Sequence, residues 1–336
     1  MKLQKYEKNP ILFSNSANEW ENLCVLNPAV WYEKKDGTFY MLYRAAGDDV
    51  KHYIYLGLAV SRNGIDFQRV ANKPVLSPSL DGSDGGGVED PRIVKFGDWY
   101  YITYASRPYA PGRYWLHEPL PWFNPPENGP DFLKKNLTLT YLAITKDFRN
   151  FKKLGRITDS RYDDRDVIIF PEKISGRYYK FSRPMEMCGK KYPCKNPSIW
   201  LSSSEDLSEW DQPEFFAQGE EWWENMKIGG GCPPLKTDKG WLFIYHGVAE
   251  KDKAYRTGAM LLDLKNPSKI LKRTKDFIME PEYDYETKGY YNGCVFPTAN
   301  AIKDGKLYVY YGAADKFICL ASCGLSELLD YLIEDC

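Results

Sequence analysis

The sequence has few histidines, no long apolar run and almost no net charge. It contains 3 His among 336 residues, and 45 Lys and Arg against 46 Asp and Glu leave a formal charge of −1. No basic face for nucleic acid or for a membrane surface is therefore predicted. No apolar run approaches the roughly 18 residues of a membrane span, and the first residues lack an apolar core of signal-peptide length. We expect a cytoplasmic protein whose partners are small molecules.

The cysteines fit neither a zinc site nor a disulfide framework. There are 8 of them, with five residues between Cys188 and Cys194 and three between Cys319 and Cys323. These spacings match no common zinc pattern. A chain of this length can bury a core without disulfides. We therefore expect free thiols and no metal.

Aromatic residues, glycine and proline are abundant. The chain has 26 Tyr, 16 Phe and 10 Trp, together with 26 Gly and 22 Pro. Segments in which tyrosine alternates with aliphatic residues recur along the chain. This composition favours strands and tight turns over helices, so the sequence predicts an all-β protein.

One pattern, a proline followed by a glycine that opens an aromatic strand, occurs five times. The prolines are Pro28, Pro91, Pro171, Pro234 and Pro297, and the glycines are Gly37, Gly97, Gly176, Gly240 and Gly305. An apolar strand follows each hairpin, at 55–60, 141–144, 198–201, 258–261 and 318–321. Three of these are followed by a segment that ends in an aromatic residue and is interpreted as a fourth strand, at 65–67, 148–151 and 207–210. Repeated units of four antiparallel strands predict a five-bladed β-propeller, formed as one domain by residues 1–336.

The two ends of the chain have distinct expected roles. The last repeat is too short for its outer strand, and we expect the segment Asn9–Phe13 to complete it and close the ring. Apolar residues of helical period then predict a short C-terminal helix, with Leu325, Leu328, Leu329, Leu332 and Ile333 on one face.

In this architecture, residues at the start of each inner strand and at the end of each second strand meet on one face. The first set contains Asn27, Asp90, Arg165 and Lys227, and the second contains Arg44, Arg107, Arg183, His246 and Asp315. A positive cluster around one or two carboxylates in an aromatic-lined cup suits a sugar together with an anion.

The segment Gly85–Arg92 contains three glycines, an acidic pair, a proline and an arginine. The glycines let the backbone approach a ligand closely, which favours Asp90 as the reactive group. In a purely structural alternative, Asp90 caps a turn before the proline and Arg92 pairs with Glu89.

Two reactions suit such a site. An inverting glycoside hydrolase needs a carboxylic acid and a separate carboxylate base, about 6.5–9.5 Å apart. A phosphorylase needs the acid and cationic groups that hold phosphate. Asp90 with Arg165, Lys227 and His246 fits the phosphorylase better.

At these residues the chain resembles glycoside hydrolase family 130, the β-mannoside phosphorylases and their hydrolytic relatives. The motifs that carry the resemblance are Gly87–Arg92, Phe170–Ile174, Ser182–Pro184, Lys227–Gly229, Tyr245–Gly247, Leu261–Leu264 and Tyr310–Asp315. The resemblance implies a five-bladed propeller that cleaves β-mannosides with inversion. With phosphate as acceptor, the product is α-mannose 1-phosphate.

The resemblance also implies roles for individual residues. Asp90 is the expected general acid, acting through a hydroxyl of the bound mannose. Phosphate is expected at Arg165, Lys227 and His246, and mannose at Asn27, Arg44 and Asp315. Further substrate-binding candidates are Glu89, Arg92, Arg107, Asp166, Arg183 and Tyr255. No cofactor is expected besides phosphate as co-substrate.

Three questions stay open at this point. Asp166 stands where some phosphorylases have Asn, so it either repels phosphate or serves as the base of a hydrolase. The insertion Pro108–Asn136, rich in aromatics and prolines, is expected on the face of Asp90 and is a lid or a subunit contact in a homo-oligomer. Its length favours the β-1,2-mannoside branch over the β-1,4 branch. A propeller that binds carbohydrate without catalysis is a further alternative.

Overall fold

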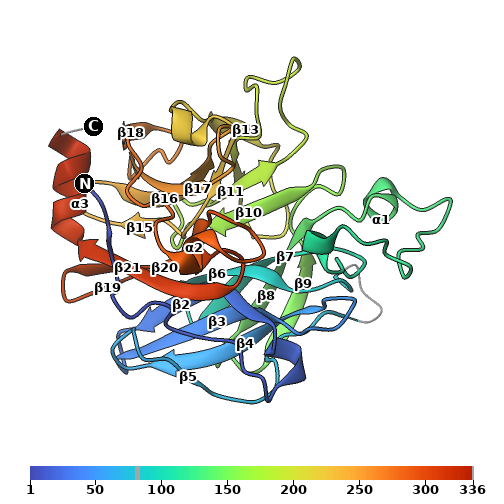
Figure 1. Ribbon diagram of the computed structural model, residues 1–336. Helices are drawn as coiled ribbons and strands as arrows, with labels where there is room; N and C mark the ends of the chain where they lie inside the picture. The colour runs from blue at the N-terminus through green and yellow to red at the C-terminus, as the bar shows by residue number, and fades with distance from the viewer. Residues whose placement is uncertain (80–83, 335–336) are drawn as a thin grey trace.

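The computed structural model describes residues 1–79 and 84–334 as five antiparallel sheets arranged in a ring (Figure 1). Each sheet is one blade of a β-propeller, which confirms the predicted fold. Blade 1 contains β2 (Cys24–Glu33), β3 (Thr38–Ala46), β4 (Ile54–Ser61) and β5 (Gln68–Arg69). Blade 2 contains β6 (Glu89–Phe96), β7 (Trp99–Ser106), β8 (Leu139–Thr145) and β9 (Phe151–Arg156). Blade 3 contains β10 (Asp164–Ile169), β11 (Tyr178–Pro184), β12 (Ile199–Ser204) and β13 (Glu214–Ala217).

The last two blades depart slightly from this scheme. Blade 4 contains β14 (Lys227–Gly230), β16 (Trp241–Val248), β17 (Tyr255–Leu262) and β18 (Ile270–Arg273), with the short β15 (Leu235–Lys236) also paired to β16. Blade 5 contains β19 (Val295–Lys303), β20 (Lys306–Ala313), β21 (Phe317–Gly324) and, from the start of the chain, β1 (Gln4–Lys5).

The five repeat glycines lie in the turns between first and second strands, as predicted. All five have positive φ, from 59° at Gly97 to 152° at Gly240. Side chains with a Cβ rarely adopt this conformation, so the turns require glycine. These turns lie at the end of each hairpin opposite to the start of the inner strand.

The predicted fourth strands are wrong in position. Residues 65–67, 148–150 and 207–210 are turns, and the outer strands β5, β9 and β13 begin after them. In blade 2 the Thr145 hydroxyl accepts the backbone N–H of Phe148 at 3.0 Å, and Asp147 accepts the N–H groups of Arg149 and Asn150. The aromatic residues therefore anchor turns, which side-chain hydrogen bonds stabilise.

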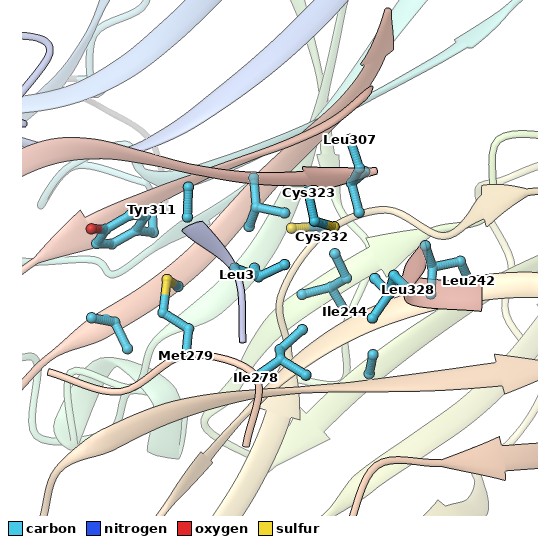
Figure 2. Close-up of a cluster of buried hydrophobic side chains, with 14 of the residues drawn as sticks. Leu3, Cys232, Leu242, Ile244, Ile278, Met279, Leu307, Tyr311, Cys323 and Leu328 are labelled. Carbon is cyan, nitrogen blue, oxygen red and sulfur yellow. The ribbon is translucent and has the colours of Figure 1, made fainter. Parts of the chain in front are cut away.

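The N-terminal segment closes the ring, but the ladder is formed by residues earlier than predicted. Gln4 and Lys5 pair with Ser322 and Ala321 of β21, while Leu12 of the expected segment forms a single bridge to Ile318. Figure 2 shows Leu3 inserted among buried side chains of blades 4 and 5. The predicted C-terminal helix is present as α3 (Leu325–Glu334), and its Leu328 and Leu332 pack into the same cluster.

Four blades share a triad of a buried tyrosine, a buried carboxylate and a cation, called the tyrosine triad below. The tyrosine lies on the second strand, the carboxylate precedes the inner strand, and the cation lies on the outer strand. The triads are Tyr43–Glu21–Arg69, Tyr104–Asp84–Lys153, Tyr245–Glu224–Arg273 and Tyr311–Glu286–Lys5, with tyrosine-to-carboxylate distances of 3.0, 2.9, 2.8 and 2.8 Å. Three of the carboxylates come from short helices, η1 (Glu19–Glu21), η3 (Trp222–Glu224) and α2 (Asp284–Thr287). Each triad ties the outer strand of a blade to the loop that enters it.

The seven cysteines in the described part of the chain are free, as predicted, whereas Cys336 lies outside the described residues. Six of these seven are buried. No helix in the described part of the chain is long and apolar enough to cross a membrane.

The triad of blade 5 generates a stability prediction. Lys5→Ala leaves Glu286, which is fully buried, without its cation at 2.8 Å. Removal of one partner from a buried pair commonly costs about 3–5 kcal/mol. We expect a loss of this size in the free energy of unfolding measured with urea.

The matched control is Lys135→Ala, since the Lys135–Asp131 pair has side chains exposed by 63% and 65%. Exposed pairs contribute about 0–1 kcal/mol. Equal losses in the two variants would contradict a structural role for the triad.

Candidate functional site

A cavity of about 440 Å³ lies at the axial end of the propeller where the inner strands begin. All five blades and the insertion contribute to its wall. The lining residues are Asn27, Arg44, Ile54, Glu89, Asp90, Arg107, Pro111, Tyr114, Arg165, Asp166, Arg183, Met185, Lys227, Tyr255, Tyr291, Cys294, Phe296 and Asp315. The structure therefore brings together eleven of the thirteen predicted site residues, all except Arg92 and His246.

Bulges in the inner strands of the first three blades turn polar side chains into the cavity. The pairing register shifts between Leu26 and Ala29, between Glu89 and Arg92, and between Arg165 and Ile168. One residue in each bulge has positive φ: Asn27 at 43°, Asp90 at 48° and Asp166 at 57°. Asn and Asp tolerate this conformation better than other residues with a Cβ. The three side chains thus occupy equivalent places at the axis.

The structure therefore corrects the proline pattern, which matched Pro171 with Pro28 and Pro91. Pro28 and Pro91 follow the bulge residue directly, but Val167 takes that place in blade 3. Pro171 comes after the far end of β10, so it is not the counterpart of Pro91. Asp166 is therefore the blade 3 counterpart of Asp90, which the proline pattern could not reveal.

Asp90 is held by two donors from blade 1. Its Oδ1 accepts hydrogen bonds from Asn27 Nδ2 at 2.8 Å and from Arg44 Nη1 at 2.9 Å. Arg44 also lies 3.3 Å from Glu89 Oε2. Burial acts to lower the pKa of Arg44, but Asp90 and Glu89 outweigh it and raise that pKa well above its usual value. Since both bonds reach Oδ1, Oδ2 is the carboxyl oxygen of Asp90 available to a ligand.

Glu89 does not pair with Arg92, contrary to the structural alternative considered for this motif. Its Oε1 lies 3.5 Å from Arg107 Nε, on the wall of the cavity. Arg92 instead donates to the Gly231 carbonyl at 2.6 Å and to the Asp90 carbonyl at 2.8 Å. Arg92 is buried behind the wall and supports the backbone of Asp90.

Three cations from blades 3 and 4 line the cavity. Arg165 bonds both oxygens of Asp163, at 2.6 and 2.8 Å, and Arg183 lies 2.7 Å from Asp166 Oδ2. The Lys227 ammonium lies 5.0 Å from the ring centroid of Tyr255. Burial and the neighbouring Arg183 lower the pKa of Lys227 to about 7.

His246 lies behind the wall rather than on it. Its side chain is fully buried, Nε2 is 3.6 Å from Asp166 Oδ2, and the ring packs 4.7 Å from that of Phe296. Burial lowers the pKa of His246 to about 3, so the imidazole is neutral near pH 7. Phosphate binding by His246 stays a prediction, and its observed contact is with Asp166.

The sequence interpretation missed several lining residues. Phe296 directly precedes Pro297, so the rule that selected Asn27 and Asp90 would also have selected it. Ile54, Met185, Tyr291 and Cys294 carry no comparable signal. Pro111 and Tyr114 belong to the insertion, of which the sequence shows only that it is rich in aromatics and prolines.

The first part of the insertion lies across the cavity, on the face of Asp90 as predicted. Tyr114, in η2 (Tyr114–Leu116), donates a hydrogen bond to Asp315 Oδ2 at 2.9 Å. The ring centroid of Trp115 lies 4.3 Å from that of Tyr290 of blade 5 and 4.9 Å from that of His52 of blade 1. Residues 108–116 therefore bridge blades 1 and 5 over the cavity. The part around α1 (Asp131–Lys134) projects from the ring on the side away from α3 (Figure 1).

Comparison with known proteins shows the family of the chain. The glycoside hydrolase family 130 model, described as beta-1,4-mannooligosaccharide phosphorylase, matches residues 2–118 and 134–334. A 1,2-beta-oligomannan phosphorylase of Thermoanaerobacter sp. (strain X514) is 35% identical over 334 residues, covering 98% of this chain and 99% of that protein. A beta-1,2-mannobiose phosphorylase of the same strain is 35% identical over 332 residues, covering 95% and 96%.

A solved structure agrees with these relatives. The Listeria innocua beta-1,2-mannobiose phosphorylase, in complex with beta-1,2-mannobiose, superposes with a TM-score of 0.78 at 27% identity, covering 99% of each chain. Because the family model and the relatives cover nearly the whole sequence, this chain belongs to glycoside hydrolase family 130.

Proposed function

We propose that the protein is an inverting β-mannoside phosphorylase, which transfers a mannosyl group from a β-1,2-linked mannoside to inorganic phosphate and releases α-mannose 1-phosphate. The observation that carries the proposal is one cavity in which Asp90 shares the wall with the cations Arg165, Arg183 and Lys227. The names of the relatives support the same reaction.

In this reaction Asp90 acts on the leaving sugar, and the cations of blades 3 and 4 bind the attacking phosphate. A phosphate oxygen attacks the anomeric carbon from the face opposite the leaving group, and the glycosidic C–O bond breaks. The proton of the Asp90 carboxyl group ends on the oxygen of the leaving sugar. Asn27 and Arg44 orient that carboxyl group through Oδ1. Because the nucleophile is already an anion, the protein supplies cations and needs no second carboxylate as base.

Hydrolysis with Asp166 as base is the less favoured alternative. A base of this kind must hold and deprotonate a water molecule. Asp166 instead lies 2.7 Å from Arg183, and although burial acts to raise its pKa, the charge of Arg183 holds that pKa below its usual value. A carboxylate kept ionised and paired in this way is a weak base, and it orients Arg183 towards the cavity.

The linkage of the substrate is inferred from the relatives, and the cellular compartment of the protein is inferred from its cysteines. The two relatives at 35% identity are named for β-1,2-mannosides, which favours this linkage over the β-1,4 linkage in the family description. The seven free thiols among the described residues are typical of a reducing compartment and favour the cytoplasm. Incubation with β-1,2- and β-1,4-mannobiose, with and without phosphate, tests reaction and linkage together through the release of mannose 1-phosphate.

The proposed acid is tested by Asp90→Asn. An amide cannot donate the required proton, and general acid catalysis contributes about 10²–10⁴-fold to the rate. We expect kcat to fall by this factor while the unfolding curve stays that of the native protein. The control is Asp131→Asn, at a carboxylate whose side chain is 65% exposed. Turnover near that of the native protein would remove Asp90 from the mechanism.

The role of Lys227 generates a pH prediction. With a pKa of about 7, Lys227 is charged below this pH and loses its charge above it. Phosphate binding by the native protein should therefore weaken as the pH rises through 7. A charge-assisted hydrogen bond contributes about 1.5–3 kcal/mol, so Lys227→Gln should raise the KM for phosphate about 10- to 100-fold below that pH.

The KM for phosphate is measured against pH in the native protein and in Lys227→Gln. The difference between these two profiles reports on Lys227, because phosphate itself ionises in the same way in both experiments. We expect the KM for phosphate to depend less on pH in Lys227→Gln than in the native protein, with little change in the KM for the mannoside. Parallel profiles, or activity independent of phosphate, would contradict the assignment.

The insertion is proposed to act as a lid through Tyr114, which reaches Asp315 across the cavity. Tyr114→Ala should raise the KM for the mannoside about tenfold and leave the mass in solution unchanged. Phe123→Ala is the control, since this ring packs on Tyr109 within the insertion at 5.2 Å. An unchanged KM with an altered mass would make the insertion a subunit contact.

A further inference from the structure

Blade 3 lacks the tyrosine triad that the other four blades share. In the triads, Tyr43 pairs with Gly57 of the third strand, Tyr245 with Gly258 and Tyr311 with Cys319. The equivalent pair of blade 3 is Ser182 and Trp200. A serine therefore stands where four blades place a buried tyrosine.

Two further positions on the same face of blade 3 are polar. Lys180, two residues before Ser182, takes the place held in the other blades by the fully buried Met41, Ile102, Phe243 and Val309. Its cross-strand partner is Ser202, where the other blades have Ala59, Ala143, Met260 and Ala321. Blade 3 has thus replaced an apolar pair and a tyrosine with a lysine and two serines.

A second cavity, of about 360 Å³, lies at these three residues, between blade 2 and blade 3. Its volume is within the range of pockets that hold small molecules. The floor is formed by Lys180, Ser182 and Ser202, and the walls include residues 156–162 on one side and 208–213 on the other. It shares no lining residue with the cavity of Asp90, because Arg183 points to the opposite face of β11.

The floor of this second cavity presents unused hydrogen-bonding groups. Lys180 is 4% exposed, and its ammonium donates to the Ile157 carbonyl and lies 4.7 Å from the ring centroid of Trp210. The described residues supply no hydrogen-bond partner to the hydroxyl groups of Ser182 and Ser202. An ammonium has three donors and a hydroxyl both donates and accepts, so these groups can bind a polar ligand.

The charges around the cavity favour a neutral ligand over an anion. The three basic residues Arg156, Arg161 and Lys180 are outnumbered by the four acidic residues Asp159, Asp164, Glu209 and Asp211. Arg161 is already bonded to Asp159 at 2.5 and 2.8 Å. Tyr162 and Trp210 add aromatic surface to the walls. Many donors and acceptors of both signs, beside aromatic rings, match the hydroxyl groups and apolar faces of a sugar.

We propose that the cavity between blades 2 and 3 is a second, non-catalytic saccharide-binding site, which holds one hexose unit over Lys180, Ser182 and Ser202. The loss of the tyrosine triad in this blade creates its space. The proposal concerns binding alone and stands whether or not the first cavity carries out phosphorolysis.

The test is calorimetric titration of the intact protein with β-1,2-mannobiose in the absence of phosphate. We expect two saccharides per chain for the native protein and one for Lys180→Met, which restores an apolar residue of the kind found in the other blades. Ser182→Tyr, which restores their tyrosine and fills the cavity, should also bind one. The rate of phosphorolysis, measured in parallel, reports on the first cavity separately.

Matched control variants distinguish the loss of the second binding site from a general loss of folded structure. Ser202→Ala should weaken the second site, while Ser322→Ala, on the third strand of blade 5, should leave two sites. The same number of saccharides per chain in the native protein and in Lys180→Met would overturn the proposal. It would also fail if inorganic phosphate alone, and no saccharide, occupied the cavity.

Discussion

Closure of the ring is the constraint on which the rest of this structure depends. Without a fourth strand the last blade would leave the edge of β21 open, and β1 covers that edge by pairing Gln4 and Lys5 with Ser322 and Ala321. The same segment inserts Leu3 between blades 4 and 5 and brings Lys5 to the buried Glu286. Since the wall of the cavity at Asp90 includes residues from Asn27 of blade 1 to Asp315 of blade 5, this cavity exists only in the closed ring.

The closed ring brings many charged side chains together at its axis, and the backbone conformation of each strand determines which way those side chains point. Bulges with positive φ aim Asn27, Asp90 and Asp166 into one cavity. Charged groups with little access to water are costly unless they are paired, and most of these are: Arg44 with Asp90 and Arg183 with Asp166. Lys227 lies against the Tyr255 ring, and burial makes its charge sensitive to pH near neutrality. An anion bound in this cavity would offset the charge of Lys227, whose neighbour Arg183 carries the same charge.

Because the five blades repeat one architecture, equivalent positions in them can be compared directly. Four blades pack a tyrosine triad at the same place, and blade 3 has different residues there. Replacement of a tyrosine by Ser182 and of an apolar residue by Lys180 removes buried apolar area and opens a polar cavity. Such a change weakens the packing between blades 2 and 3 unless another contact offsets it. A bound ligand is one way to offset that loss.

The fold and most of the candidate site could be predicted from the sequence, partly from residue patterns and partly from the family resemblance. The repeat glycines mark hairpins because their positive φ excludes most other residues, and the helical period of Leu325–Ile333 follows from burial of one face. Eleven of the thirteen predicted site residues line the cavity because propeller topology brings the starts of the inner strands and the ends of the second strands, with the loops beside them, to the same face.

The remaining features depended on contacts between residues far apart in the chain. Burial behind Asp166 keeps His246 off the cavity wall, and no local pattern reports such burial. The equivalence of Asp166 with Asp90 required the strand register, since Val167 replaces the marker proline. The sequence by itself determined the hairpins, the third strand of each blade and the chemical character of the axial face, because these depend on local conformation and periodicity, whereas it misplaced the outer strands. Only the tertiary structure decided which charges are paired, which are buried and where a cavity opens, because packing between blades sets all three.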